Sequence, residues 1–547
     1  MLHKIRWTAQ KIAARIALIQ PMIYRQREAL APFRYKALSG PEEAPPIAAD
    51  VDDSAWEVVQ SESYWGGWRT DFILRTSFQV PASFDSGAPA ALYLPLGEAR
   101  DFSHPESLAY IDGQPYASAD RHHREIILPA HVRDGQPHRL ALHGWTGQAM
   151  HSDPNERLFM RECAIVQIDQ PTRDLVAMAR VALDVTTQLS DDDPAKGRIF
   201  NALEAAFVAL DTRDPLGTDA FYNSVPAAFN ALRKGIATAG EPMNVDIVAL
   251  GHAHIDVAWL WTLAQTMRKT GRTFSNVLRL MEQFPDFTFS QSQPQLYQYA
   301  EQHYPELFEQ IKARVAEGRW ETMGGTWVEP DCNCIGAESL ARQFLLGRGY
   351  FRKHFGDGDT PVLWLPDTFG YSWALPQLIK LAGMKYFITH KMSWNQYNQM
   401  PNQILWWQGL DGTRVLTHFL TTPSGSEYLP YSTTYNGEVS ALEVFGTWQN
   451  FRQKETYNEL TTVYGYGDGG GGPTREMLEN IEQLKCHPGA PRVRSGTVRE
   501  YMERIENEAA DTLPVWNGEF YFEYHRGTYT SQARNKRHNR KSEVLLH

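Results

Sequence analysis

Cysteine, long apolar runs and an excess of basic residues are all missing from this sequence. Four cysteines in 547 residues exclude a disulfide scaffold and favour a reducing compartment. No run of about 18 apolar residues occurs, so we expect no membrane-spanning helix and no membrane partner. The net charge of −11 argues against a nucleic-acid binder, which needs a positively charged face. Since no secretory signal stands out either, we expect a cytoplasmic protein.

What the sequence contains is typical of a folded, multidomain protein. Hydrophobic residues make up 42% and charged residues 21%, which excludes a wholly disordered chain. The length corresponds to about three to four domains. Aromatic residues reach 12%, including 16 Trp. Their flat faces suit sugars and nucleobases, although aromatic rings also fill hydrophobic cores.

The first half of the chain changes its hydrophobic pattern twice. Apolar residues recur at helical spacing within residues 1–49: Ile5, Ala9, Ile12, Ile16 and Ile19. We expect an amphipathic helix docked on the protein there, with a basic targeting peptide as the alternative. Residues 50–170 contain short β-prone runs and turn signals such as Asp112-Gly113, which predict a β-sandwich-like domain. Residues 171–243 return to helical spacing and are expected to be a helical connector.

From residue 244 to residue 515, β-prone runs alternate with helical stretches. This alternation predicts an α/β domain with a mainly parallel sheet or barrel. In such folds, catalytic and binding residues gather just after the carboxyl ends of the strands. Residues 516–547 include a basic, polar end without a helix stop signal, which looks like an element cut off partway.

A His-x-His-x-Asp pattern follows the first of these expected strands, 245–250. His254 and Asp256 are two residues apart, so in an extended segment both side chains leave on the same face and can share a divalent cation. His252 has the same parity and could join them. The alternative is a polar loop whose histidines satisfy backbone groups, but the position at a strand end favours a metal site.

Two more strand ends carry single carboxylates. Asp367 follows the run 362–365 and could be a nucleophile, a general base or a metal ligand, or it could cap the helix expected over 373–381. Asp468 precedes four glycines. No Lys-Ser/Thr follows them, so the run is not a phosphate-binding P-loop. We interpret the glycines as room for a bulky substrate beside Asp468, with a flexible turn as the alternative.

Two carboxylates near one metal suggest a hydrolase, because glycosidases use one carboxylate as nucleophile and the other as acid and base. Nearby tryptophans offer sugar-stacking faces, although most are expected in the core: Trp259, Trp261, Trp327, Trp364, Trp373 and Trp394. Cys332 and Cys334 form a CxC pair, which is a weak zinc pattern without a second pair. We expect both to be buried thiols.

Taken together, five segments resemble glycoside hydrolase family 38, the retaining α-mannosidases. They stand in the family's order: GHAHIDVAWLW (251–261), WLPDTFGYS (364–372), KMSWNQYN (391–398), GDGGGGPT (467–474) and EYHRGTYT (523–530). The resemblance covers most of the chain and points to the cytosolic and vacuolar branch with its bacterial relatives. It implies a (β/α)7-barrel-like catalytic domain over 244–515. Residues 516–547 would then begin a truncated α-helical middle domain.

The resemblance also implies roles for individual residues. His254, Asp256, Asp367 and His525 would bind one divalent metal ion; spacing alone gives no hint of His525. Zinc is the first candidate, and cobalt, manganese and calcium are alternatives. Asp367 would also be the nucleophile, and Asp468 the acid and base. The expected substrate contacts are Trp259 beneath the mannose, Asp331 at sugar hydroxyls, Trp394 and His252.

The activity implied by the resemblance is metal-dependent, retaining hydrolysis of terminal α-D-mannose from oligosaccharides or glycan fragments, through a glycosyl-aspartate intermediate. Three alternatives stay open. They are a hydrolase of a small mannoside such as a mannosylated organic acid, a metal-dependent deacetylase or amidohydrolase, and a catalytically dead carbohydrate-binding fragment. Family members are usually much longer, so we expect this chain alone to be less stable and poorly active. Homo-oligomer formation is left open.

Overall fold

The computed structural model describes residues 7–99, 102–147, 153–356, 360–425 and 432–546. The chain forms two compact units, each built from three segments. The first unit comprises Met1–Met243, Ile255–Gln283 and Asp468–Ala490, and the second comprises Asn244–His254, Phe284–Gly467 and Pro491–His547. Two segments of the first unit therefore come from the expected α/β domain. The domain boundaries drawn from the sequence stay predictions.

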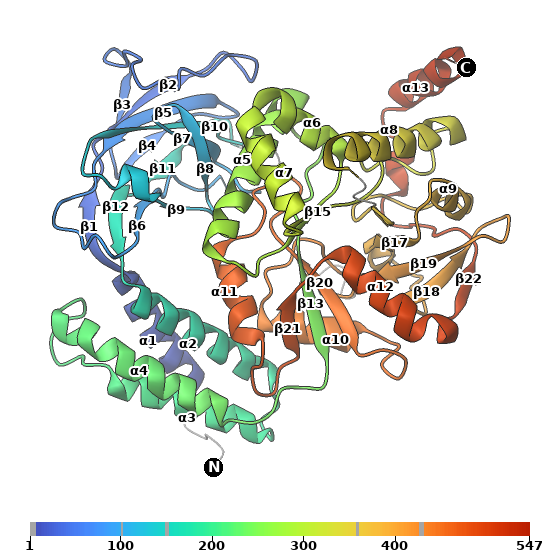
Figure 1. Cartoon of the computed structure of the whole chain (residues 1–547). Helices are drawn as coiled ribbons and strands as arrows, with labels where there is room; N and C mark the ends of the chain where they lie inside the picture. The colour runs from blue at the N-terminus through green and yellow to red at the C-terminus, as the bar shows by residue number, and fades with distance from the viewer. Residues whose placement is uncertain (1–6, 100–101, 148–152, 357–359, 426–431, 547) are drawn as a thin grey trace. The chain divides into compact units, whose positions relative to one another are not determined.

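Two antiparallel sheets form the β part of the first unit (Figure 1). One has the strand order β1-β12-β6-β9 and the other the order β3-β2-β5-β10-β7-β8. The strands are β1 Tyr24–Ala29, β2 Phe33–Ala37, β3 Glu57–Val59, β5 Asp71–Phe78, β6 Ala90–Tyr93, β7 Glu106–Ile111, β8 Gln114–Asp120, β9 Glu125–Ile127, β10 His138–Trp145 and β12 Ala164–Ile168; β4 Ser63–Trp65 pairs with β11 Leu158–Met160. Leu92 from one sheet and Leu142 from the other lie in the same hydrophobic core, as in a sandwich.

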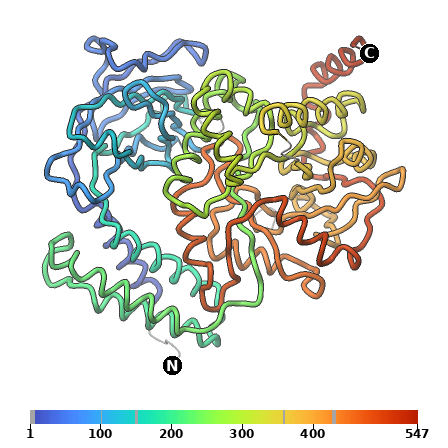
Figure 2. The backbone as a smooth tube through the Cα atoms, in the orientation of Figure 1, coloured from blue at the N-terminus to red at the C-terminus, as the bar shows by residue number. Residues whose placement is uncertain are grey.

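Six helices complete the first unit: α1 Thr8–Ile19, α2 Gln170–Gln188, α3 Pro194–Ala209, α4 Asp219–Ala237, α5 Leu263–Gln283 and α11 Arg475–Leu484. Ile12, Ile16 and Ile19 are buried on α1, which confirms the expected amphipathic helix; Ile5 lies outside the described residues. Helix α2 begins where Asp169 accepts the Thr172 N–H at 3.0 Å, a standard N-cap. Helix α11 packs against α2 although the two are far apart in the chain (Figure 2).

Strand–helix alternation builds the second unit. Its first sheet is entirely parallel and contains β13 Asp246–Gly251, β14 Phe289–Gln291, β15 Trp320–Thr322, β20 Glu459–Tyr464 and β21 Arg492–Ser495. The second sheet has the order β16-β17-β19-β18-β22. Its strands are β16 Val362–Trp364, β17 Tyr386–Thr389, β18 Ile404–Gln408, β19 Arg414–Phe419 and β22 Val515–Asn517. The helices are α6 Pro294–His303, α7 Pro305–Ala316, α8 Ala337–Phe355, α9 Leu375–Leu381, α10 Ala441–Asn450, α12 Val498–Ala509 and α13 Ala533–Leu546.

The mixed α/β character expected from residue 244 onward is confirmed, and three strands were missed: β18, β21 and β22. Strand β18 runs antiparallel to β19. Its continuous Ile-Leu-Trp-Trp run has no period of two, and periodicity alone does not separate such a run from a buried helix segment. The seven-stranded barrel layout stays a prediction, because the described strands form two separate sheets.

The C-terminal stretch is helical, as expected. Helix α13 buries none of its residues, and Leu545 and Leu546 are 84% and 89% exposed. Across the part of the chain that the structure describes, no helix has both the length and the apolar character needed to cross a bilayer.

Candidate functional site

His252 follows β13 directly and is held entirely by protein groups. Its Nδ1 lies 2.8 Å from the Ser290 carbonyl oxygen, and its Nε2 accepts the Trp364 indole N–H at 3.3 Å. The ring is fully buried, and this burial lowers its pKa to about 3. Both ring nitrogens are therefore engaged by neutral partners. This arrangement orients the strand end and leaves neither nitrogen available to a substrate or metal.

His254 is buried between two carboxylates of the second unit. Its Nδ1 lies 3.0 Å from Glu329 Oε2, and its Nε2 lies 3.7 Å from Asp367 Oδ2. Glu329 is itself fixed, because its other oxygen accepts the Ser292 hydroxyl at 3.0 Å. These contacts place Nδ1 beside Glu329 and Nε2 beside Asp367, an arrangement in which a carboxylate can orient a metal-binding imidazole.

Asp367 lies in the loop after β16, where Tyr371 fixes the backbone. The Tyr371 hydroxyl is hydrogen-bonded to the carbonyl oxygens of Leu365 and Thr368 at 3.0 and 2.8 Å. Helix α9 has Ala374 as its N-cap residue. The reading of Asp367 as a helix cap is therefore wrong, because the helix begins too far along the chain. The carboxylate is instead available for chemistry at the strand end.

A lysine that sequence reasoning passed over is ion-paired with Asp367. Lys391 Nζ contacts Asp367 Oδ1 and also lies 4.2 Å above the ring of Trp394. Trp394 is anchored in turn, because its indole N–H donates to the Thr433 carbonyl at 2.8 Å. The short helix Lys391–Trp394 after β17 thus brings a cation and an aromatic face to the nucleophile candidate.

His525 reaches the same group of residues from the C-terminal segment. Its ring stacks on Phe369, with centroids 4.5 Å apart and planes at 14°, and on Phe522 at 5.3 Å. Burial, followed by the charge of Lys391, lowers the pKa of His525. The Nδ1 atom is buried and has no hydrogen-bond partner among the described residues. A neutral imidazole with an unsatisfied nitrogen is a suitable metal ligand.

Asp256 and Asp468 belong to the first unit and are joined through their backbones. The Asp256 N–H donates to the Asp468 carbonyl at 2.9 Å, and Ile255 and Gly469 form the adjoining antiparallel bridge. Asp468 has a φ of 56°, in the left-handed region that costs a non-glycine residue energy. Such strain occurs often at functional positions.

Trp259 is the most exposed of the candidate stacking residues, with 51% of its surface accessible. Phe102 and Trp261 hold it edge-on, with ring centroids at 5.3 and 5.8 Å. By contrast, Trp364 is fully buried and Trp261 is 5% exposed, so these two are core residues. An exposed ring held by two others is suited to stacking on a sugar face.

Two of the glycines after Asp468 are required by close packing against neighbouring side chains rather than by open space. A Cβ at Gly470 would lie 2.6 Å from Thr273 Oγ1, and one at Gly471 would lie 3.1 Å from both Arg272 and Ser103. The interpretation of these two glycines as room for substrate is therefore wrong. Side chains of the first unit approach the backbone too closely for any larger residue.

The segment 331–334 forms a turn that has one buried and one exposed cysteine. Asp331 Oδ1 accepts the N–H groups of Asn333 and Cys334 at 2.7 and 3.0 Å, which shapes a tight turn. Cys332 is buried as expected, but Cys334 is exposed, which corrects the expectation for the second thiol. The turn points one thiol inward and the other outward. The role of Asp331 at sugar hydroxyls stays a prediction.

The expected site residues divide between the two compact units of the chain. His254, Asp367, Lys391 and His525 belong to the second unit, and Asp256, Asp468 and Trp259 to the first. His254, Asp256, Asp367 and Asp468 can each offer one atom to a metal ion. Sequence reasoning missed Glu329 and Lys391, although both lie inside segments it quoted: Trp327-Val-Glu-Pro-Asp and KMSWNQYN. The signal that could have identified them was the presence of a charged residue inside a motif at a strand end.

Comparison with known proteins gives consistent results. The family described as "Glycosyl hydrolases family 38 N-terminal domain" matches residues 244–519. Alpha-mannosidase G of Dictyostelium discoideum is 44% identical over 299 residues, which cover 55% of this chain and 26% of that protein. Alpha-mannosidase 2C1 of Mus musculus is 34% identical over 455 residues, covering 81% of this chain and 42% of that protein. This chain thus matches less than half the length of either relative.

A solved alpha-mannosidase from Enterococcus faecalis V583 aligns with 51% of this chain and 31% of its own, at 20% identity and a TM-score of 0.41. The sequence match to the family extends from β13 to the residues after β22, and so includes His254, Asp256, Asp367 and Asp468. Since this match covers just over half of the chain, the chain belongs to glycosyl hydrolase family 38.

Proposed function

We propose that this chain is a retaining, metal-dependent α-mannosidase. The observation that carries the proposal is the setting of Asp367, a strand-end carboxylate in contact with Lys391 and beside His254. The family supports glycoside hydrolysis, and the two relatives described above are named alpha-mannosidases. α-Mannosides are therefore the proposed substrates, and terminal mannose of oligosaccharides or glycan fragments is the proposed group released.

We propose that His254, Asp256 and Asp367 hold one divalent ion, with His525 as the fourth protein ligand. Only Ile255 separates His254 from Asp256 in the chain, so the two side chains are neighbours by covalent geometry. The donor set of imidazole nitrogens and carboxylate oxygens fits zinc, and also cobalt or manganese. The unpartnered Nδ1 of His525 fits the same role. A bound ion would supply positive charge to vicinal sugar hydroxyls and to the carboxylates.

The chain's own residues perform the proposed chemistry in two steps. Asp367 attacks C1 of the mannose while Asp468 donates a proton to the leaving oxygen, and a glycosyl–Asp367 ester forms. Asp468 then takes a proton from water, the water oxygen attacks C1, and Asp367 leaves as a carboxylate. Two inversions give net retention. Lys391 holds the Asp367 carboxylate in place, and Trp259 offers a stacking face.

The alternatives differ in what they do to Asp367. A deacetylase or amidohydrolase would use Asp367 as a ligand or base and would form no covalent sugar adduct. A hydrolase of small mannosides would form the adduct but act poorly on oligosaccharides. A carbohydrate-binding protein would bind mannose but would not hydrolyse mannosides.

The test is release of para-nitrophenol from para-nitrophenyl α-mannoside, before and after chelation and after zinc or cobalt is restored. We expect turnover that the chelator abolishes and the metal recovers. A 2-fluoro mannosyl reagent should then label the peptide that contains Asp367. Turnover that survives complete metal removal, or labelling elsewhere, would overturn the proposed mechanism.

A further inference from the structure

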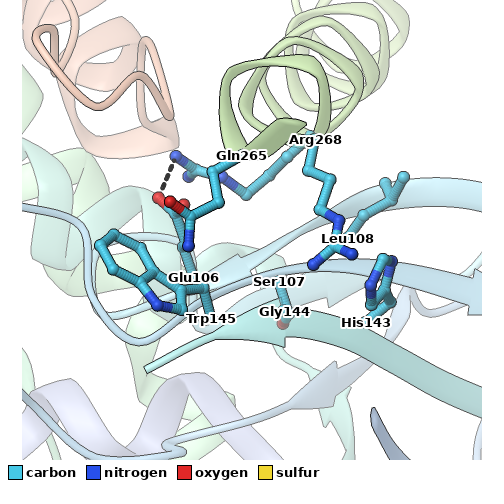
Figure 3. Close-up of a pocket in the computed structure, with 9 residues that line it drawn as sticks. Glu106, Ser107, Leu108, His143, Gly144, Trp145, Gln265 and Arg268 are labelled. Atoms are coloured by element: carbon cyan, nitrogen blue, oxygen red, sulfur yellow. Dashed lines mark hydrogen bonds and ion pairs between the residues drawn. The ribbon is translucent and has the colours of Figure 1, made fainter. Parts of the chain in front are cut away.

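Three buried ion pairs join the six-stranded sheet of the first unit to helix α5. Glu106 on β7 accepts Lys269 Nζ at 2.6 Å and the Arg272 guanidinium at 2.9 Å. The same guanidinium donates to Asp120, at the end of β8, at 2.6 Å. Figure 3 shows this contact region, where Gln265 of α5 lies over Glu106 and Trp145, and Arg268 extends toward Leu108 and His143. The space left between sheet and helix is a cavity of about 10 Å³, so the two elements are closely packed.

The basic groups around the two acids, Glu106 and Asp120, stabilise the charged forms of both. Burial raises the pKa of Glu106, but Lys269 and Arg272 together outweigh this effect and leave it lowered. Burial likewise raises the pKa of Asp120, and His123 and Arg272 more than reverse it. A buried network of this kind fixes geometry more than it adds stability.

This cluster continues into the glycine-rich loop that carries Asp468. Arg272 donates to the Gly469 carbonyl at 2.8 Å, and the Ser103 hydroxyl donates to the Gly470 carbonyl at 2.9 Å. Thr273 Oγ1 accepts the Gly471 N–H at 2.9 Å. Further along the loop, Asn276 Nδ2 donates to the carbonyls of Gly471 and Pro473, and His123 Nε2 lies 2.9 Å from the Pro473 carbonyl.

The loop needs these partners because its own backbone has no preferred path. Gly470, Gly471 and Gly472 have φ values of 76°, 109° and 71°, all in the region where glycine is free. A run of glycines loses much conformational entropy when it is fixed. Each peptide in it is therefore oriented by the donors and acceptors around it. The position of Asp468, the residue before this run, depends on that orientation.

We propose that Arg272, Ser103, Thr273 and Asn276 are positioning residues that fix Asp468 for proton transfer, and that the N-terminal β-sheets supply part of this support. The acid–base role of Asp468 rests on the proposed function, whereas the anchoring of the loop does not. In this proposal the sheet that contains β7 and β8 supports a catalytic residue through helix α5.

A pair of mild substitutions tests the proposal. Ser103→Ala with Thr273→Val removes two hydroxyls that bond the loop. Ser107→Ala with Thr270→Val is the matched control: Ser107 and Thr270 are equally buried, Ser107 in the strand that follows Ser103 and Thr270 in the same helix as Thr273, but their hydroxyls donate to Ala119 and Thr266. Hydrogen exchange of peptides that cover residues 467–474 is measured by mass spectrometry in both doubles.

We expect the first double variant to exchange the amides of Gly469–Gly472 about tenfold faster or more, while the control matches the unmodified chain. Unchanged exchange in the first double variant, or equal acceleration throughout both, would overturn the anchoring. This arm needs no turnover, so it decides the anchoring even if the proposed activity fails.

The second arm compares kcat/KM for two leaving groups. The alkoxide leaving group of an alkyl α-mannoside needs a proton from the acid. The 2,4-dinitrophenolate of 2,4-dinitrophenyl α-mannoside leaves without one. A misplaced Asp468 should lower kcat/KM for the alkyl substrate about tenfold or more and leave the activated one within about twofold. Equal loss with both substrates would mean a general structural defect and would overturn the positioning role. No turnover by the unmodified chain would contradict the proposed function instead.

Discussion

The Nδ1 atom of His254 lies 3.0 Å from Oε2 of Glu329. This contact makes Glu329 the candidate residue for orienting the ring of a proposed metal ligand. Ser292 fixes the glutamate from the other side, so the pair is held rigidly. A chain of this kind, from hydroxyl to carboxylate to imidazole, allows the metal site to be tested without touching a ligand.

Glu329→Gln should weaken metal binding about 10- to 100-fold, because a neutral amide supports the His254 ring less well than a carboxylate. Zinc or cobalt affinity is measured by competition with a chromogenic chelator. Glu443→Gln is the control, since Glu443 is a glutamate of the same unit whose side chain accepts the backbone N–H groups of Glu438 and Ser440. Equal affinity in Glu329→Gln and Glu443→Gln would remove Glu329 from the metal site.

Asp367→Asn should reduce kcat by about 10³-fold or more, because an amide cannot form the glycosyl ester. The expected loss applies to activated and unactivated mannosides alike, in contrast to the loop variants above. Circular dichroism confirms that the variant is folded. Retention of most of the turnover would exclude Asp367 as the nucleophile.

The fourth metal ligand can be identified by two substitutions compared side by side. If His525 binds the metal, His525→Ala should lower metal affinity by about 10²-fold or more while Asp468→Asn changes it only a few-fold. The opposite order would assign Asp468 to the metal and require another acid. The competition assay used for Glu329 serves both variants and does not depend on activity.

The stability of the second unit should fall as the solution is acidified. His418 is fully buried, its Nδ1 is hydrogen-bonded to the Tyr501 hydroxyl at 2.7 Å, and burial lowers its pKa to about 3. An unfolded histidine has a pKa of about 6.5, so between these values the unfolded state binds more protons and stability decreases as pH falls. Above about pH 6.5 the contribution is fully present.

In urea titrations, the unmodified chain should lose on the order of 2 kcal/mol more than His418→Gln between pH 7.5 and pH 5. Glutamine keeps a partner for Tyr501 but cannot be protonated. His303→Gln, at an exposed position, is the control and should follow the unmodified chain. Parallel pH profiles for the unmodified chain and His418→Gln would show that His418 does not titrate as its burial requires.

The local sequence was enough to predict most strands of the second unit and some of the candidate site residues. The alternation of β-prone and helical runs identified β13, β14, β15, β16, β17, β19 and β20. The spacing of His254 and Asp256 and the place of Asp367 after β16 followed from chain geometry alone. Strands β18, β21 and β22 were missed. Periodicity does not separate the continuous Ile-Leu-Trp-Trp run of β18 from a buried helix segment, and β21 (Arg-Val-Arg-Ser) and β22 (Val-Trp-Asn) contain few apolar residues.

The sequence by itself indicated the α/β pattern and the residues at the strand ends, since these depend on short-range spacing, and its motifs carried the resemblance to the family. Only the tertiary structure decided which distant groups meet them. The contact of Glu329 with His254, the contact of Lys391 with Asp367, and the anchoring of Gly469 by Arg272 each join segments far apart in the chain. Such pairings are set by how buried elements pack, and a one-dimensional pattern does not encode the distance between two side chains that are separated by whole strands and helices.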